Sequence, residues 1–177
     1  MVRRFVPRAN PCKQALLGAV LLVSGCGGGG KSERPPQVVR GTGYRFEAPA
    51  GWTIVRSGRQ VQAAEGGKSL ALVAVSRFPL LRAAKEELSA KVVKELDRVA
   101  TGVAAQQHGS ISSSETTGLS GVQARRYDIA YEARGKQLVE RLVFVLRGKT
   151  EYLLLCRYEQ GGDTGPCSEL LRTFRLA

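Results

Sequence analysis

Apolar and polar residues alternate along much of the chain after residue 43, as they do in half-buried β-strands. The first run, Tyr44-Arg45-Phe46-Glu47, is followed by the turn Pro49-Ala50-Gly51. The loop Glu65-Gly66-Gly67-Lys68 and the turns Arg134-Gly135 and Gly148-Lys149 separate later runs. The pattern therefore predicts further strands at 52–55, 59–64, 70–78, 122–132, 138–147 and 151–158.

A different spacing appears between the two groups of strands. Leu81, Ala84, Leu88, Val92, Leu96, Val99 and Val103 recur at steps of three and four residues. This spacing predicts one amphipathic helix from about Leu80 to Ala105, whose apolar face covers a sheet or meets a partner helix. The polar segment 106–114 is expected to be a loop that leads into a short strand, and 168–174 a short C-terminal helix.

The apolar pattern of the later strands predicts the fold class. Leu138, Leu142 and Phe144 would lie on one face of a strand, and Val143 and Val145 on the other. Antiparallel strands that are apolar on both faces need cover on both sides. We therefore predict an α+β domain, with an antiparallel β-sheet covered by helices on both faces as an α/β/α sandwich.

The N-terminus has the organisation of an export signal. Basic residues precede a short apolar run, Ala15–Val23, which is too short to span about 30 Å of hydrocarbon as a stable helix. The run continues into Val23-Ser24-Gly25-Cys26, which resembles the bacterial lipobox, where the cysteine is acylated and becomes the mature N-terminus. The alternative is a plain signal peptide with a chance cysteine.

The lipobox interpretation divides the chain into three parts. Residues 1–25 would be a lipoprotein signal peptide, 26–42 a flexible Gly/Ser/Pro tether, and 43–177 a single folded domain. The predicted location is the extracytoplasmic face of the cell membrane, where the lipid on Cys26 holds the protein.

A second motif overlaps the lipobox. Residues 25–32 match the P-loop pattern G-x-x-x-x-G-K-[ST]. A P-loop requires a helix directly after the lysine, whereas Pro35 and Pro36 follow Lys31 within five residues. The context therefore argues against nucleotide binding.

The charge of the chain is strongly basic, at +12 for 177 residues. The predicted leader holds four basic residues and no acidic one, so the mature charge falls to about +8. Because an exported protein with scattered basic residues is a poor candidate for nucleic-acid binding, we interpret the charge as attraction to anionic headgroups or as a solvated basic face.

Cysteine usage agrees with export. Cys12 would leave with the leader and Cys26 would take the lipid, so Cys156 and Cys167 remain as an even pair. In an oxidising compartment such a pair predicts a disulfide; two buried thiols are the alternative.

The strand-and-turn motif Tyr44-x-Phe46-x-x-Pro49-x-Gly51-Trp52 resembles the start of PsbP/Mog1-like domains. The C-terminal segment, from Tyr152-x-Leu154-x-Cys156 to Leu171-x-x-Phe174, resembles lipoproteins of that type from high-GC Gram-positive bacteria. The family includes photosystem accessory proteins, a regulator of a nuclear GTPase and mycobacterial envelope lipoproteins linked to lipid trafficking. The resemblance implies the α/β/α sandwich but no particular chemistry, because members share a fold and not an activity.

Candidate catalytic and metal-binding residues are sparse. His108 is the single histidine, no G-x-S-x-G motif is present, and Cys156 and Cys167 are expected to be oxidised. We therefore predict no enzyme activity, no cofactor and no metal.

A binding surface is expected where loops and aromatic residues meet. The candidates are Trp52 in the 49–52 turn, and Gln106, Gln107 and His108 at the start of the 106–117 loop. The predicted function is a non-catalytic binding or docking domain that meets an envelope protein. A carrier of a lipid-like or apolar ligand is the alternative, and an unrecognised hydrolase is the third hypothesis.

Overall fold

The computed structural model describes residues 35–85 and 87–177. Cys26, the predicted signal peptide and the P-loop-like segment 25–32 lie outside the described residues.

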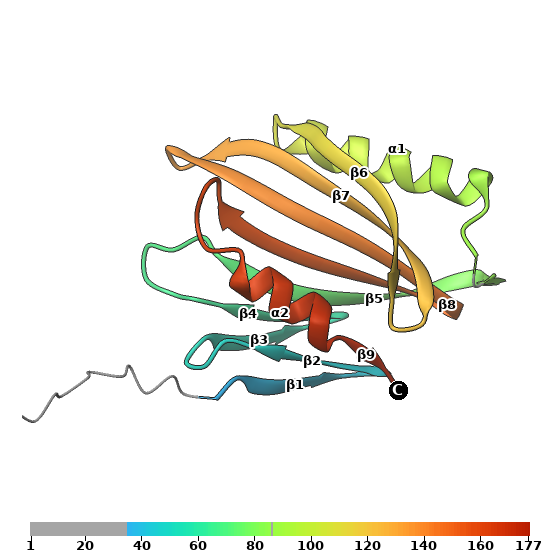
Figure 1. The fold of residues 1–177 in the computed structure, drawn as a ribbon, viewed down its shortest axis with the longest axis horizontal. Coiled ribbons are helices and arrows are strands. Elements are labelled where there is room, and N and C mark those ends of the chain that lie inside the picture. Colours follow the sequence, from blue (N-terminus) through green and yellow to red (C-terminus); the bar gives the residue numbers. More distant parts are fainter. Residues whose placement is uncertain (1–34, 86) are drawn as a thin grey trace, which may run out of the picture. The chain divides into compact units, whose positions relative to one another are not determined.

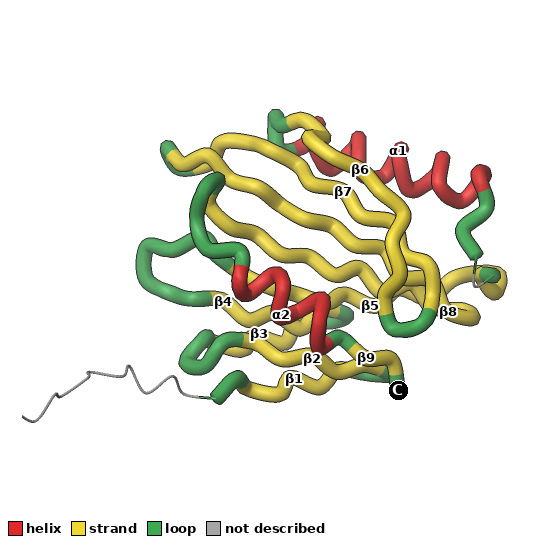
Figure 2. The backbone as a smooth tube through the Cα atoms, viewed as in Figure 1, coloured by secondary structure: helices red, strands yellow, loops and turns green. Residues whose placement is uncertain are grey.

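Most strands form a six-stranded antiparallel sheet in the order β3-β4-β5-β8-β7-β6 (Figures 1 and 2). The glycine-rich loop at 65–68 joins β4 to β5, as predicted, and Arg134-Gly135 joins β7 to β8. The α+β class and the antiparallel pairing are thus confirmed. The bounds are β3 Thr53–Ser57, β4 Gln60–Ala64, β5 Leu72–Ala84, β6 Ser110–Leu119, β7 Val122–Ala133 and β8 Lys136–Glu159.

Strand β8 folds back on itself at Gly148, whose φ is 55°. Its first arm pairs with β7 through residues 136–145, and its second arm pairs with β5 through residues 148–157. The backbone N–H of Gln160 donates to the carbonyl of Gln137 at 2.9 Å, so the arms lie side by side. The two arms correspond to the strands predicted at 138–147 and 151–158.

A second, three-stranded sheet is formed by β1 (Gln37–Gly41), β2 (Tyr44–Ala48) and β9 (Arg175–Leu176). Strand β1 lies inside the range 26–42 that the sequence assigned to a tether, so ordered structure begins before residue 43. The strand is short and adjoins a Gly/Ser/Pro-rich stretch, but Val39 is buried in the core. Its pairing with β2, from Gln37 opposite Ala48 to Gly41 opposite Tyr44, makes it a strand.

Helix α1 spans Ala90–Gln106, and not 80–105 as predicted. Residues 80–84 continue β5 instead, and Leu81 is fully exposed. The start is local: the Ser89 side chain accepts a hydrogen bond from the backbone N–H of Val92 and caps the helix. The predicted loop at 106–114 is also wrong beyond residue 109, because β6 begins at Ser110.

The core forms two clusters on opposite faces of the large sheet. The buried face of α1 packs against Tyr127, Leu142 and Phe144. Val143 and Val145 alternate with Leu142 and Phe144 along β8, so they face the opposite side of the sheet. They pack in the other cluster with α2 (Gly165–Thr173) and the small sheet. The cover on this second face therefore contains strands as well as a helix.

Candidate functional site

The structure places Trp52 at the edge of the core. The side chain is half-buried against the cluster that contains α2, and the backbone carbonyl accepts a hydrogen bond from Gln37 Nε2 at 2.8 Å. The same amide donates to the carbonyl of Pro49 at 2.9 Å. Residue 52 therefore takes part in holding β1 against the 49–52 turn.

Gln106, Gln107 and His108 lie at the C-terminal end of α1. Gln106 and His108 are exposed, and His108 adopts a φ of 54° where the chain leaves the helix. Gln107 Nε2 donates to Glu140 Oε1 at 2.8 Å, on the face that α1 covers. Since Trp52 packs with the other cluster, the structure does not bring these residues together with it.

Cys156 and Cys167 are joined as a disulfide, with their Cα atoms 5.5 Å apart. Both side chains are buried in the cluster between the second arm of β8 and α2. The bond therefore ties the last long strand to the last helix.

The strongest candidate site is a cavity of about 500 Å³ where β1, β3, β4 and β5 meet. Four arginines from separate segments line it: Arg40 on β1, Arg56 on β3, Arg59 in the β3–β4 turn and Arg77 on β5. Among the described residues that line it, none is acidic. We call this the arginine cavity.

Two close backbone approaches shape the arginine cavity. A Cβ built on Gly41 would lie 2.1 Å from Cζ of Tyr44, so only glycine allows the β1 backbone to lie on that ring. Gly58, with a φ of 53°, makes the tight turn that presents Arg59.

Tyr44 is buried beside the cavity and donates its hydroxyl hydrogen to the carbonyl of Val75 at 3.1 Å. Burial, partly offset by the charge of Arg56, raises the pKa of Tyr44 to about 12. The phenol therefore stays neutral at physiological pH.

Few protein groups accept hydrogen bonds from the guanidinium groups of the arginine cavity. Arg56 Nη2 donates to the carbonyl of Arg40 at 3.2 Å, and Arg77 Nη2 to Thr150 Oγ1 at 3.5 Å. Arg77 Nε is buried without a hydrogen-bond partner. None of the four makes an ion pair within the part of the chain that the structure describes. An incoming anion would supply the missing acceptors.

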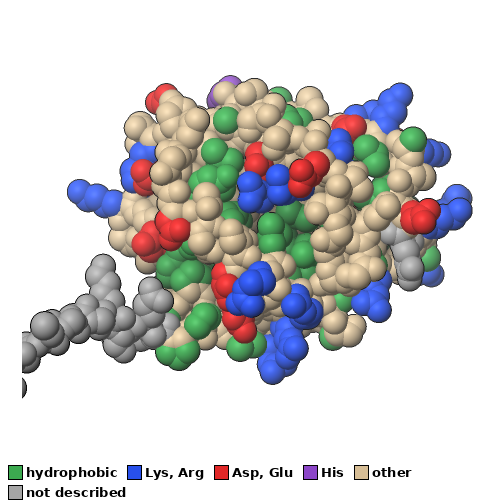
Figure 3. All heavy atoms as spheres, in the orientation of Figure 1, with side chains coloured by type: hydrophobic (Ala, Val, Ile, Leu, Met, Phe, Trp, Pro, Cys, Tyr) green, Lys and Arg blue, Asp and Glu red, His purple; other side chains and the backbone are tan. Residues whose placement is uncertain are grey.

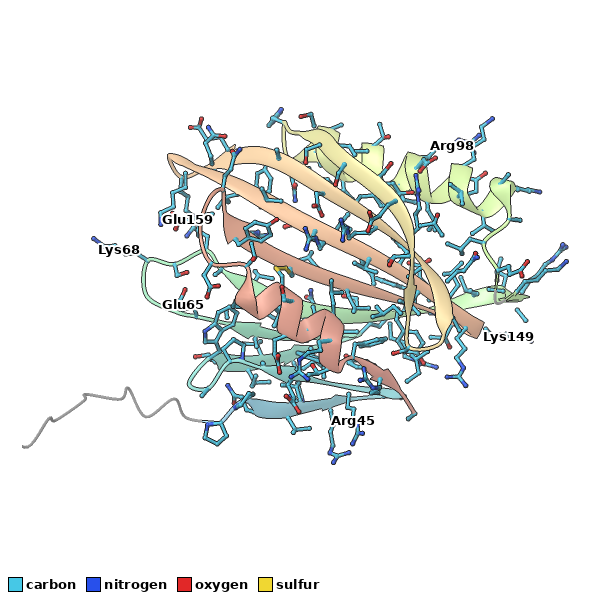
Figure 4. All side chains as sticks on the ribbon, viewed as in Figure 1. Arg45, Glu65, Lys68, Arg98, Lys149 and Glu159 are labelled. Atoms are coloured by element: carbon cyan, nitrogen blue, oxygen red, sulfur yellow. A yellow bond between two sulfur atoms is a disulfide. The ribbon has the colours of Figure 1, made fainter. Side chains whose placement is uncertain are left out.

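A second cavity of about 520 Å³ adjoins the first. The two share Arg40, Gly41 and Tyr44, and Arg45 and Arg175 line the second. The basic surface thus continues from the large sheet onto the small one; Figure 4 shows Arg45 projecting from it.

Planar guanidinium groups bind phosphate or carboxylate oxygens through paired N–H donors. The sequence does not reveal this convergence, because residues 40, 56, 59 and 77 follow no motif spacing. In residues 35–85 and 87–177, no three His, Cys, Asp or Glu side chains gather where they could hold a metal ion. The same ranges contain no helix with the length and apolarity needed to cross a membrane.

Comparison with known proteins identifies the fold. No protein-family model matches the sequence, and no curated protein matches it. The solution structure of cyanobacterial PsbP (CyanoP) from Synechocystis aligns with a TM-score of 0.56 at 16% identity, over 88% of this chain and 99% of that one. The domain has a PsbP-like fold.

Two further structures are similar. A crystal structure from Bacteroides thetaiotaomicron aligns with a TM-score of 0.59 at 12% identity, over 82% of this chain but only 49% of that one. LpqN, described as involved in cell envelope biogenesis of Mycobacterium tuberculosis, aligns with a TM-score of 0.48 at 9% identity, over 82% and 87% of the chains. At such identities the PsbP-like domain is defined by its fold alone, and its function has to be argued from its own residues.

Proposed function

We propose that this protein is an envelope lipoprotein whose PsbP-like α/β/α domain is a non-catalytic binding module for an anionic, phosphate-bearing ligand. The observation that carries the proposal is the convergence of four arginines without carboxylate partners around one cavity of about 500 Å³. The lipid at Cys26 would hold the module at the extracytoplasmic face of the membrane.

The chemistry of the arginine cavity supports an anion over a neutral ligand. A hydrogen bond to a charged group contributes about 1.5–3 kcal/mol, and bidentate Arg–phosphate contacts are among the strongest. Arg77 adds a charge whose Nε has no hydrogen-bond partner among the described residues. Several such contacts would offset the cost of ordering the exposed arginines Arg40, Arg56 and Arg59.

Two features support an extracytoplasmic location. The bond between Cys156 and Cys167 suits an oxidising compartment. The N-terminal run that ends at Cys26 has the build of a lipoprotein signal. A lipid with an anionic headgroup would offer the required phosphate, whereas an envelope protein would present carboxylates in its place. Because arginines dominate the lining, the cavity favours the charged end of such a ligand over an apolar body.

Calorimetric titration of the full chain with inorganic pyrophosphate tests the proposal. Arg59→Gln removes one exposed donor of the cavity and is expected to weaken binding about tenfold or more. Arg98→Gln is the matched control: it removes the same charge from α1, where Arg98 pairs with Glu95 at 2.6 Å. An equal loss in both variants, or in neither, would exclude the arginine cavity as the binding site.

A further inference from the structure

The end of β5 carries an unusually exposed apolar residue. Pairing between β5 and β8 is regular up to Pro79 opposite Thr150 and resumes only at Ala84 opposite Gly148. The residues between leave the regular ladder, and Leu81 is 100% exposed there. Water solvates such an exposed apolar side chain unfavourably.

Exposed basic residues lie on the same segment as Leu81 and on the adjoining turn of β8. Arg82 and Lys85 follow Leu81 on the β5 side, and Arg147 and Lys149 lie on the turn between the arms of β8. All four are exposed, and the Ala84–Gly148 pairing brings the two segments together. We call residues 80–85 with 147–149 the basic tip.

The figures show the same arrangement. Figure 1 shows the end of β5 beside the turn of β8, and Figure 4 shows Lys149 projecting from that turn. In Figure 3, Lys and Arg side chains stand out from this end of the sheet, on the right of the view.

Opposing charge at the basic tip is limited. Within the described residues, none of its four basic side chains has a carboxylate within 4.0 Å. Among the described residues, the nearby acidic ones are the exposed Glu87 and the partly buried Glu151, opposite Phe78 on β5; Glu86, which follows Lys85 in the sequence, lies outside the described residues. Burial raises the pKa of Glu151, which lowers its tendency to carry charge.

We propose that the basic tip docks on an anionic lipid surface, with Leu81 entering the headgroup region and the four basic side chains contacting lipid phosphates. One exposed aliphatic side chain on a segment with several exposed basic residues complements an interface that is apolar beneath and anionic above. Pro79 lines the arginine cavity and precedes the tip, so docking would bring the cavity close to the membrane surface. The proposal does not depend on what the cavity binds.

The test places a fluorescent probe at the tip of the full chain. The variant Leu81→Trp with Trp52→Phe contains one tryptophan, since Trp52 is the only natural one. The probe reports the environment of residue 81 even where the apolar N-terminal run attaches the chain to vesicles. If the double variant does not fold, Leu81→Trp alone serves, with the emission of Trp52 subtracted.

With vesicles of phosphatidylcholine and phosphatidylglycerol, the emission is expected to shift to shorter wavelength and acrylamide quenching to fall about twofold or more. With vesicles of phosphatidylcholine alone no shift is expected, and high salt should abolish the shift seen with anionic vesicles. The reason is that each basic residue contributes about fivefold to partitioning into an anionic surface. Changing Arg82, Lys85, Arg147 and Lys149 together to Gln should likewise abolish the shift.

Three results would overturn the proposal. The first is an unchanged emission with anionic vesicles, and the second is an equal shift with neutral ones. The third is a shift produced by soluble polyglutamate but not by anionic vesicles, which would indicate an acidic protein partner instead. Binding of pyrophosphate is measured separately, so these outcomes leave the arginine cavity to its own test.

Discussion

Glu140 on the first arm of β8 is a buried charge whose removal should destabilise the domain strongly. Its side chain is 2% exposed. Oε2 accepts hydrogen bonds from Arg157 Nη2 at 2.8 Å and Nε at 3.0 Å, and Oε1 accepts one from Gln107 at 2.8 Å. The Tyr131 hydroxyl lies 3.4 Å from Oε2. The carboxylate thus joins both arms of β8 to the end of α1.

The expected cost of Glu140→Ala is about 3 kcal/mol. Breaking a buried ion pair by removing one partner costs roughly 3–5 kcal/mol, because the other charge stays buried. We expect a loss at the lower end of this range, because 27% of the Arg157 side chain is exposed and its guanidinium can turn toward water. For a domain of this size the loss corresponds to a fall of roughly 10 °C in the melting temperature.

Urea unfolding followed by circular dichroism measures this cost. Glu140→Ala, Arg157→Ala and the double variant form a cycle, and the double variant should lose clearly less than the sum of the single ones. The matched control is Glu159→Ala, since Glu159 pairs with Lys136 across the same two arms but is largely exposed. Glu159→Ala should lower the free energy of unfolding by less than about 1 kcal/mol.

A fall in the free energy of unfolding of less than about 1 kcal/mol for Glu140→Ala would refute this reasoning, as would additive falls for the two single variants in the cycle.

The same unfolding measurement tests the role of Gln107. If this residue is structural, Gln107→Ala should lower stability by about 1 kcal/mol and leave ligand binding unchanged.

Three further predictions follow from single sites. Cys26→Ala should release the protein from the membrane fraction or leave it uncleaved; a processed membrane form on a fractionation blot would contradict the lipid anchor. Cys156→Ala with Cys167→Ala should cost about 3 kcal/mol in urea unfolding, because the bond closes a loop with a sequence separation of 11 residues; a cost near zero would exclude a stabilising bond. Burial raises the pKa of Asp128, but the ion pair with Arg141 outweighs it and holds that pKa below its usual value. The pair therefore stabilises the fold fully above the unfolded-state pKa near 4. This contribution is lost as the pH falls through the lower folded-state pKa. Asp128→Asn should therefore reduce the fall in the free energy of unfolding between about pH 4 and lower pH. An unchanged pH dependence in urea unfolding would contradict the assignment.

Local sequence determined most of the secondary structure. The alternation on β8 places Leu142 and Phe144 on one face and Val143 and Val145 on the other, as the two core clusters confirm. Turn glycines such as Gly135 and Gly148 also lie where a positive φ is needed. These features depend on neighbours within a few residues, so a single sequence is enough to predict them.

The boundaries of the predicted helix show where local pattern fails. The spacing of Leu81, Ala84 and Leu88 agrees with a helix, yet these residues precede α1 and two of them lie on β5. Pairing of β5 with the second arm of β8, up to Pro79 and again at Ala84, keeps this part of the chain extended, and the Ser89 cap marks the actual start of the helix.

The candidate site was decided by tertiary structure alone. Arg40, Arg59 and Arg77 are separated by 18 residues or more along the chain. Pairing of β4 with β5 places Arg59 beside Arg77, whereas Arg40 reaches the same cavity from β1 of the small sheet. Strand β1 pairs with β2, a contact that the adjoining Gly/Ser/Pro-rich sequence does not reveal. Sheet register joins residues that share no local signal, since its hydrogen bonds depend on which distant strands meet and not on the spacing of residues within each one.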